Sequence, residues 1–451
     1  MTRPALIVGL GGTGQWVLTW LKRDLMLSNG GTVPDNIRLL SIDTATTLEA
    51  GQKQVTANDK EDNQPAKVGG VTLDRTEFIY VGGDARPIAL ETRDNRHPQL
   101  KRWFRAKYWL DTQPPAVFVL DNGAGRIRQF GRLAIYKDIM GGDDGQKLWS
   151  AFRTAIGTVG RMTNAERRLE IIVVGSFAGG TGSGMFLDVG LILRKLAKEI
   201  SPHHVLRGFF ALPGVFTPNP SRDMKARTFA AWRELNRFMV IDSDFPMSSV
   251  DYVENDSTYG IDPAERIFDA CYLVEGKRKG APVASEARFG VFPMVSEVIS
   301  AILDEQAGQV YNDWVYTNLA EEYGKHPTTP MYSAIGAYTV QVPANFVEVM
   351  SSHIFGQEML KRLLSPEVAP DANTKKLVAS GALRHLTLAA KARNLEDPGF
   401  AGRQRADTFL TSESAYEGQM VNPTIFMARA ATLLSEAREQ GKLPQVIDRL
   451  A

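Results

Sequence analysis

The feature that most constrains the fold is a glycine-rich loop between two apolar runs near the middle of the chain. Residues 178–184 are Ala-Gly-Gly-Thr-Gly-Ser-Gly, with the β-branched run 171–174 before them and the apolar run 185–193 after them. This order is typical of a strand, a tight loop and the start of a helix. A loop without Cβ atoms lets several backbone N–H groups converge on an anion, and the helix adds its unpaired N–H groups and its dipole. The loop therefore predicts a phosphate site.

One alternative stays open for this loop taken alone. No Lys follows its last glycine, so it is not a Walker A motif. A glycine-rich strand–helix turn that packs closely and binds nothing would show the same sequence. The rest of the chain favours the phosphate site, because similar loops recur.

A second glycine loop lies near the N-terminus. Residues 5–8 form a short apolar strand, followed by Gly9-Leu10-Gly11-Gly12-Thr13-Gly14-Gln15 and an apolar helix. Gly9, Gly11 and Gly14 have the G-x-G-x-x-G spacing of a dinucleotide-binding turn. The strand 37–42 then ends in Asp43-Thr44, where NAD and FAD folds carry a ribose-binding acid. Asp43 comes later than the ~20 residues expected after the last glycine.

Further strands are expected at residues 116–120, 204–212 and 267–274, the first of them ending before Gly123-Ala124-Gly125-Arg126. Strands alternating with helices over residues 5–275 predict a doubly wound parallel sheet, an α/β fold. Ligands of such sheets bind at the carboxyl ends of the strands. All the glycine loops and Asp43 fall at that edge, which is a more specific signal than any one loop.

The chain is expected to have three parts. Residues 1–287 form the nucleotide-binding domain, residues 288–324 a long central helix that Gly324 ends, and residues 325–451 a smaller, mostly helical C-terminal domain. A strand at 332–342 and an amphipathic helix at 346–364 are expected within the last part.

Composition excludes several classes of protein. With 451 residues and a net charge of +1, no overall field points to nucleic acid or to an anionic membrane. The basic stretch 93–107, with Trp103 and Phe104, could touch nucleic acid or an acidic partner, but the near-neutral total charge favours an exposed helical face. The single cysteine, Cys271, fits a reducing compartment and an inert core thiol. No run approaches the ~20 apolar residues of a membrane span, and Arg3 is followed directly by a strand and not by a signal-peptide pattern, so we expect a cytoplasmic protein. No metal-ligand spacing occurs.

The loops, taken together, occur in the order of the nucleotide loops of the tubulin/FtsZ superfamily. Residues 178–184 closely resemble its G-G-G-T-G-[ST]-G signature, with Ala178 in place of the first glycine. Over roughly residues 3–340, the chain is similar to the divergent bacterial tubulin-like proteins. The fold that this resemblance implies is the Rossmann-like GTPase domain of the superfamily.

The resemblance implies that GTP or GDP is the ligand, with Mg²⁺. Each loop then has a place around the nucleotide. Gly11, Gly12, Thr13 and Gln15 would lie near the phosphates, and Asp43 and Thr44 near the γ-phosphate or Mg²⁺. The γ-phosphate would be contacted by Gly123, Ala124, Gly125 and Arg126. The α- and β-phosphates would be wrapped by the central loop, Ala178, Gly179, Gly180, Thr181, Gly182, Ser183 and Gly184. The ribose would lie near Asn219 or Arg222, and guanine would stack on Phe292.

In the superfamily, acidic residues of one subunit complete hydrolysis at the nucleotide of the next subunit in a filament. Here Glu321 and Glu322 would take that role, although the N-x-D pattern of the superfamily is missing. The resemblance thus implies a GTPase that assembles with itself into a homo-oligomer or filament, with room for other protein partners. Two alternatives remain: a GTP-binding scaffold without hydrolysis or polymerisation, and a Rossmann NAD or FAD oxidoreductase.

Overall fold

The computed structural model describes residues 2–45, 66–141, 147–164, 167–240, 249–263, 265–278, 281–282, 287, 290–326 and 328–335. The chain divides into two compact units, Met1–Tyr338 and Thr339–Ala451, and the described residues belong to the first. The helices expected beyond residue 345, and most of the strand expected at 332–342, lie outside the described residues.

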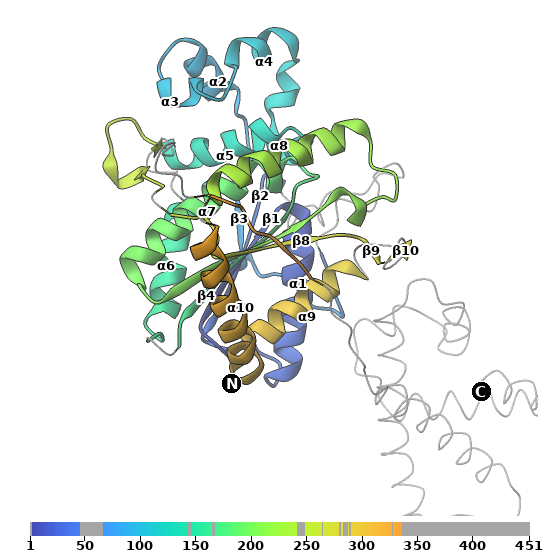
Figure 1. Ribbon diagram of the computed structural model, residues 1–451. Helices are drawn as coiled ribbons and strands as arrows, with labels where there is room; N and C mark the ends of the chain where they lie inside the picture. The colour runs from blue at the N-terminus through green and yellow to red at the C-terminus, as the bar shows by residue number, and fades with distance from the viewer. Residues whose placement is uncertain are drawn as a thin grey trace, which may run out of the picture. The chain divides into compact units, whose positions relative to one another are not determined.

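A seven-stranded sheet forms the centre of the first unit, in the order β11-β8-β5-β4-β1-β2-β3 (Figure 1). Its strands are β1 Ala5–Leu10, β2 Ile37–Asp43, β3 Phe78–Tyr80, β4 Leu169–Ser176, β5 His204–Ala211, β8 Ala270–Val274 and β11 Ser333–Ala334. Every pairing in this sheet is parallel. β1 and β4 are buried along their whole length, as expected for strands with both faces covered. The predicted doubly wound parallel sheet is confirmed.

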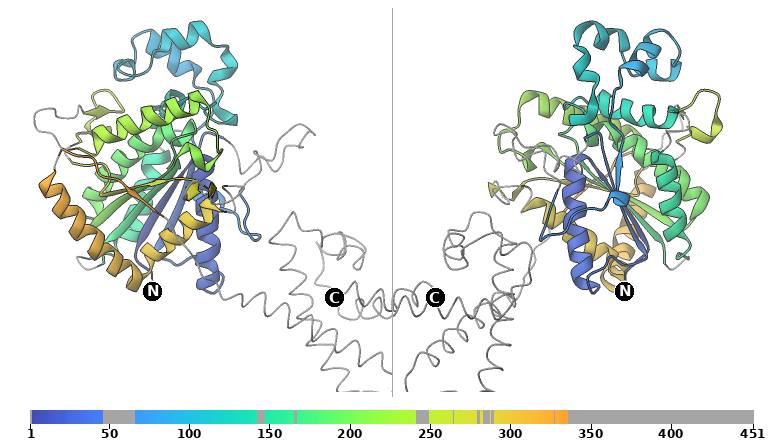
Figure 2. Two further views of the ribbon diagram at one scale, coloured as in Figure 1. Left: turned by 45° about the vertical axis from the view of Figure 1, so that its right-hand side comes forward. Right: turned by 180° about the vertical axis from the view of Figure 1, so that it is seen from behind.

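Helices cover both faces of the sheet (Figure 2). They are α1 Gly11–Ser28, α5 Arg128–Met140, α6 Lys147–Gly160, α7 Thr181–Ile200, α8 Arg222–Phe238, α9 Val291–Leu303 and α10 Glu305–Lys325. Alternate residues of β1 enter two different cores: Ile7 packs with α1 and α9, whereas Leu6 and Val8 pack with α5, α6 and α7. Among the described residues, no helix is long and apolar enough to cross a membrane.

A lobe of three short helices projects beyond α5 (Figure 1). They are α2 Arg86–Arg93, α3 Pro98–Lys101 and α4 Ala106–Thr112, followed by the 3-10 turns η4 Pro115–Phe118 and η5 Leu120–Asn122. The strand expected at 116–120 is therefore wrong. Pro114 and Pro115 restrict the backbone there and lack N–H donors, and only Val119 bridges to Asp84. The outer strand is instead β3, which is too short to show a pattern in the sequence.

The segment expected to form one long helix contains two. Asp304 adopts an extended backbone, and its carboxylate accepts hydrogen bonds from the N–H groups of Gln306 and Ala307, at 3.0 and 2.8 Å. Asp304 thus ends α9 and caps α10. A Cβ atom at Gly308 would overlap the carbonyl of Ile302, so only glycine lets α10 turn so close to α9. The domain limits at 287 and 325 stay a prediction.

Smaller elements complete the unit. They are the strand pairs β6 Val250–Asp251 with β7 Gly260–Ile261 and β9 Lys277–Arg278 with β10 Ala281–Pro282, and the 3-10 turns η3 Arg75–Glu77, η7 Pro213–Val215 and η8 Ser257–Tyr259. Cys271 is buried in β8, and burial raises the pKa of its thiol above the usual value. This fits the core thiol that the sequence predicts.

Candidate functional site

The glycine loops meet where the sheet changes its winding direction. β1 pairs with β2 on one side and with β4 on the other, and β4 continues to β5. α1 begins directly after β1, and α7 begins five residues after the end of β4, both at the carboxyl edge of the sheet. In doubly wound sheets this switch point is where ligands bind.

Two helix N-termini lie side by side at this edge. The N-cap residues of α1 and α7 are Leu10 and Gly180; neither helix has a side-chain cap or an acidic residue in its first turn. A Cβ atom at Gly11 would lie 3.4 Å from the Cβ of Thr181, so the two helix starts are in contact. Unpaired N–H groups and the positive ends of two dipoles thus gather at one place, which favours an anion.

The glycines of the central loop serve two purposes. A Cβ atom at Gly180 would lie 2.9 Å from the Cα of Arg126, and one at Gly184 would overlap the carbonyl of Arg128. Close packing therefore explains these two. A Cβ atom at Gly179 would have nothing within 4 Å, and the same holds for Gly12. Close packing does not explain glycine at those two positions, which border open space at the carboxyl edge of the sheet.

Gly123-Ala124-Gly125-Arg126 forms a tight loop against the central one. Gly123, Gly125 and Arg126 have φ values of 95°, 57° and 62°, and such values are costly for the non-glycine Arg126. Open space surrounds the positions where Gly123 and Gly125 would carry a Cβ atom. Ala124 is buried and the Arg126 side chain is exposed. The loop therefore faces the same edge with little side-chain cover.

Asp43 is the last residue of β2, and Thr44 follows it beside the start of α7. The hydroxyl oxygens of Thr44 and Thr181 are 2.9 Å apart. The Asp43 carboxylate accepts the N–H groups of Thr44 and Ala45, at 2.7 and 3.3 Å. Burial raises the pKa of Asp43 to about 6, although these hydrogen bonds oppose the shift. The group therefore gains its negative charge only near neutral pH.

Gln15, in the first turns of α1, is buried, whereas Thr13 is partly exposed. Asn219 and Arg222 are exposed beyond the carboxyl end of β5, and Ser221 caps α8 by accepting the N–H of Met224 at 3.3 Å, as the sequence predicts.

Phe292 lies in the core, only 4% exposed, with its ring centroid 6.3 Å from that of Phe216. Phe216 is 40% exposed and follows η7 at the carboxyl edge, so it is the ring of this pair that solvent reaches. The sequence analysis missed Phe216, although its place in the loop after the strand 204–212 was a usable signal.

Glu321 and Glu322 do not join the glycine loops within the chain. They are exposed in the last turn of α10 and pair with Lys325, at 2.7 and 3.3 Å. The guanidinium of Arg266, which precedes β8, lies 3.8 Å from the ring centroid of Tyr323. This part of α10 therefore lies near the amino end of β8, at the opposite edge of the sheet.

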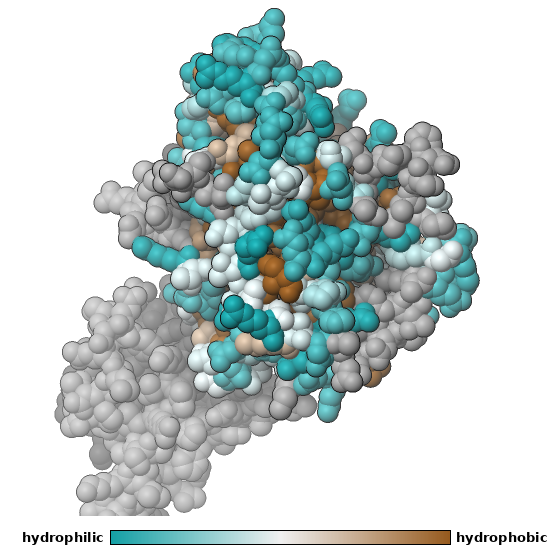
Figure 3. All heavy atoms as spheres, turned by 90° about the vertical axis from the view of Figure 1, so that its left-hand side faces the viewer, coloured by the Kyte–Doolittle hydropathy of each residue, from teal (hydrophilic) through white to brown (hydrophobic). Residues whose placement is uncertain are grey.

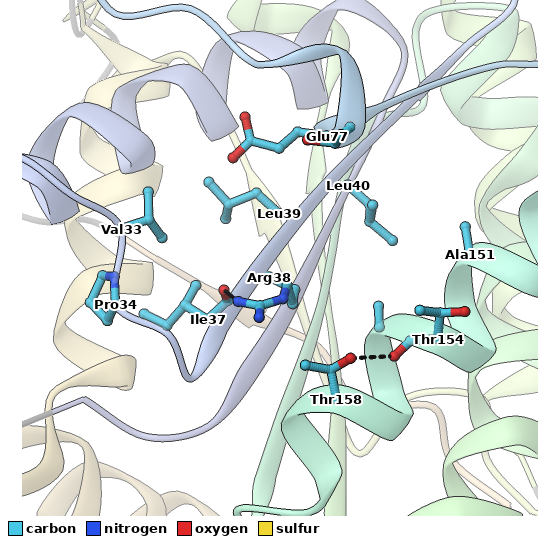
Figure 4. A pocket seen from close by; sticks show the side chains of 12 residues that line it. Val33, Pro34, Ile37, Arg38, Leu39, Leu40, Glu77, Ala151, Thr154 and Thr158 are labelled. Atoms are coloured by element: carbon cyan, nitrogen blue, oxygen red, sulfur yellow. Dashed lines mark hydrogen bonds between the residues drawn. The ribbon is translucent and has the colours of Figure 1, made fainter.

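A shallow pocket lies away from the glycine loops, beside the amino-terminal half of β2 and α6 (Figure 4). Its two charged side chains already have partners within the protein. Arg38 donates to the carbonyls of Asp35 and Ile37, and the Glu77 carboxylate contacts Lys22 at 2.7 Å. We therefore do not assign the site to this pocket.

A doubly wound sheet with glycine loops at its switch point is the architecture of α/β nucleotide-binding proteins. Within that class, residues 6–359 match the family model described as "Tubulin like". The match spans most of the sequence, so the chain belongs to this tubulin-like family, and the resemblance inferred from the glycine loops is confirmed. No curated protein sequence matches the chain.

Solved structures of low identity also resemble the chain. CetZ2 from Haloferax volcanii, a GTPgS-bound protofilament, is 15% identical with a TM-score of 0.37, covering 78% of this chain and 72% of that one. CetZ1 from the same organism, a GDP-bound monomer, is 12% identical with a TM-score of 0.36, covering 78% and 71%. TubZ from Bacillus thuringiensis serovar israelensis, a GTPyS-form protofilament, is 12% identical with a TM-score of 0.31, covering 71% and 56%. The assignment depends on the family match and not on these structures.

Proposed function

We propose that this chain binds a guanine nucleotide at the carboxyl edge of its sheet and hydrolyses GTP, with Mg²⁺, in step with self-assembly in the cytoplasm. The observation that carries the proposal is the meeting of two uncapped helix N-termini, at Leu10 and Gly180, with glycine positions that face open space. The choice of guanine comes from the tubulin-like family.

The residues at this edge fit a phosphate chain. Gly12 and Gly179 leave room where a side chain would otherwise stand, and the first turns of α1 and α7 offer N–H donors without competing carboxylates. The Thr44 and Thr181 hydroxyls add donors between the two loops. Mg²⁺ bound to a nucleotide usually keeps few protein ligands, and Asp43 with Thr44 would contribute them here. The bound ion would neutralise developing charge on the phosphates.

The exposed Arg126 is proposed to stabilise charge on the transferred phosphoryl group, because a guanidinium is suited to phosphate oxygens. Asn219 or Arg222 would meet the ribose. Phe292 as the partner of guanine is less well supported, since its ring is buried.

Hydrolysis is proposed to need two subunits. Glu321 and Glu322 lie near the opposite edge from the glycine loops, so they can reach a nucleotide only in a neighbouring copy stacked head to tail. There they would position the attacking water, as the resemblance to the superfamily implies. Mutation of both to Ala is expected to leave nucleotide affinity unchanged and to lower phosphate release.

The second candidate is a GTP-binding scaffold that does not hydrolyse GTP. One observation favours it: both carboxylates already pair with Lys325 of their own helix. A Rossmann oxidoreductase is the least favoured alternative, because the glycine loops recur around one site and no catalytic dyad is evident.

The test combines nucleotide identity with turnover. Purified full-length protein is titrated with fluorescent GTP, ATP and NADH in the presence of Mg²⁺, and phosphate release is followed over a protein concentration series. Preferential GTP binding, with activity that rises more than linearly with protein, is expected. Binding with flat, negligible release would favour the scaffold, and tight NADH binding without guanine nucleotide would overturn the proposal.

A matched pair of variants locates the site. Gly179→Asp places a carboxylate in the open space of the central loop without a clash at Cβ, and it is expected to abolish nucleotide binding. Gly157→Asp adds the same side chain on α6, where a Cβ atom also meets nothing within 4 Å. That control should bind like the wild type. Equal affinity of both variants would remove the central loop from the site.

A further inference from the structure

The projecting lobe, residues 84–119, is more basic than the rest of the chain. It has seven Lys or Arg residues against four Asp or Glu residues, whereas the whole chain has a net charge of +1. All seven cations are exposed: Arg86, Arg93, Arg96, Lys101, Arg102, Arg105 and Lys107. Within the described part of the chain only Arg93 has an ion-pair partner, Asp94 at 3.0 Å. Six of the seven cations therefore form no ion pair with a described residue, and the lobe carries a net charge of +3.

The lobe is a packed scaffold. Leu100 and Phe104 are buried, and the guanidinium of Arg132 on α5 lies 4.6 Å from the ring centroid of Trp103. Trp109 donates a hydrogen bond to Gln129 of α5. The basic side chains thus start from a backbone held in place against α5. On the face shown in Figure 3 the surface of the lobe is mainly hydrophilic.

A second projecting segment carries the opposite charge. Residues 249–263, here called the acidic arm, contain four acids and no Lys or Arg: Asp251, Glu254, Asp256 and Asp262. The arm is shaped by the antiparallel pair β6–β7, and the hydroxyl of the buried Tyr252 anchors it by donating to Asp188 at 2.9 Å. No ion pair of these four acids is formed with any described residue.

The lobe and the arm leave the body as separate projections (Figure 2). We propose that the basic lobe of one copy binds the acidic arm of a second copy of this chain. Their charges are complementary, and apart from Arg93 neither set forms an ion pair with a described residue of its own chain. Because the two surfaces differ, the contact is heterologous and leaves a free lobe at one end and a free arm at the other, so it can add further copies.

A nucleic acid is a less favoured occupant of the lobe. Outside the lobe the chain has a net charge of −2, since the lobe contributes +3 to the total of +1. A nucleic-acid duplex is longer than the lobe, so its phosphates would also lie against the negatively charged rest of the chain and be repelled. An acidic arm is short enough to contact the lobe alone. The inference goes beyond nucleotide-driven stacking, and its test requires no nucleotide.

The experiment measures self-association of the full chain by sedimentation velocity at low and at high salt. Arg102→Glu with Arg105→Glu reverses the lobe, and Glu254→Lys with Asp262→Lys reverses the arm. Each pair is expected to weaken association about tenfold at low salt, and the effect should fade at high salt because exposed charges are screened. The chain that carries all four substitutions should regain most of the association. Arg161→Glu with Lys225→Glu, exposed elsewhere, is the charge-matched control and should behave like the wild type.

The proposal is overturned if lobe reversal leaves association unchanged, or if the four-substitution chain associates no better than either pair. It is also overturned if the lobe binds a 30-nucleotide DNA while the arm variant associates normally. Fluorescent GTP titration of the same proteins separates failure of the lobe–arm proposal from failure of the proposed function. The lobe variant should bind GTP as the wild type does. If the wild type itself does not bind GTP, that result contradicts only the proposed function.

Discussion

Replacing Asp43 by Asn should change how stability depends on pH. Burial raises the pKa of this carboxyl from 3.8 to about 6. Between these values the folded protein holds a proton that the unfolded chain has released, so the wild type loses stability as pH rises through this window. At 1.36 kcal/mol per pKa unit, the ionised group costs about 3 kcal/mol at pH 8, and about 2.5 kcal/mol of this develops above pH 4.

The amide of Asp43→Asn has nearly the same shape and no charge to desolvate. Its oxygen can still accept the N–H groups of Thr44 and Ala45. Any constant cost of the substitution cancels when the two proteins are compared at two pH values. The difference in melting temperature between variant and wild type should therefore increase from pH 4 to pH 8. For the folded unit Met1–Tyr338 the expected increase is about 3–4 °C.

The assay is thermal unfolding of both proteins over this pH range without nucleotide, followed by circular dichroism. Asp35→Asn, which removes the same charge from an exposed position, accounts for the general effect of net charge. A melting difference for Asp43→Asn that is flat across the range, or that shrinks with rising pH, would refute the argument.

Three further predictions concern buried groups. Gly180→Ala is expected to lower the melting temperature, because its Cβ atom would lie 2.9 Å from neighbouring backbone, whereas Gly179→Ala should not; a comparison of the two by calorimetry tests this. Asp188→Ala removes the buried counter-charge of the partly exposed Arg132, its partner at 2.9 Å, and should cost about 2–3 kcal/mol in urea unfolding; a loss below 1 kcal/mol would contradict this. Cys271 should react with a thiol reagent only as fast as the protein unfolds, because the thiol is buried with a raised pKa; rapid reaction of the native protein would show that it is accessible.

The sequence predicted the sheet well because buried parallel strands leave a local signal. β1, β2, β4 and β5 each contain a short, mainly apolar run, and glycine, acid or proline stands at or near its end, so few alternatives fit such a pattern. β3 was not predictable because a strand of three residues shows no periodicity. The turns at 116–120 were not predictable because the apolar run there is typical of a strand, whereas the prolines at 114 and 115 prevent one.

The candidate site was predictable only where glycine marks it. Positions such as Gly12 and Gly179 are recognised by the missing side chain, and the parallel topology brings their loops together. Exposure of an aromatic ring depends on packing between distant segments, so the sequence did not distinguish Phe292 from Phe216. The division of the long helix at Asp304 was likewise hidden, since Asp occurs on helix surfaces as well as at caps.

The contact between Gly9 and Gly14 bears on how glycine motifs are used to sort sequences. A Cβ atom at Gly14 would overlap the backbone of Gly9, and one at Gly9 would lie 2.7 Å from the carbonyl carbon of Gly14. These two members of the G-x-G-x-x-G pattern are thus required by the crossing of α1 over β1, whatever molecule occupies the edge. A motif search that scores them as cofactor determinants would assign the chain to the dehydrogenases. Gly12 and Gly179 instead border open space beside the two helix N-termini, so weight placed on them would relate the motif to this edge of the sheet and not to the crossing.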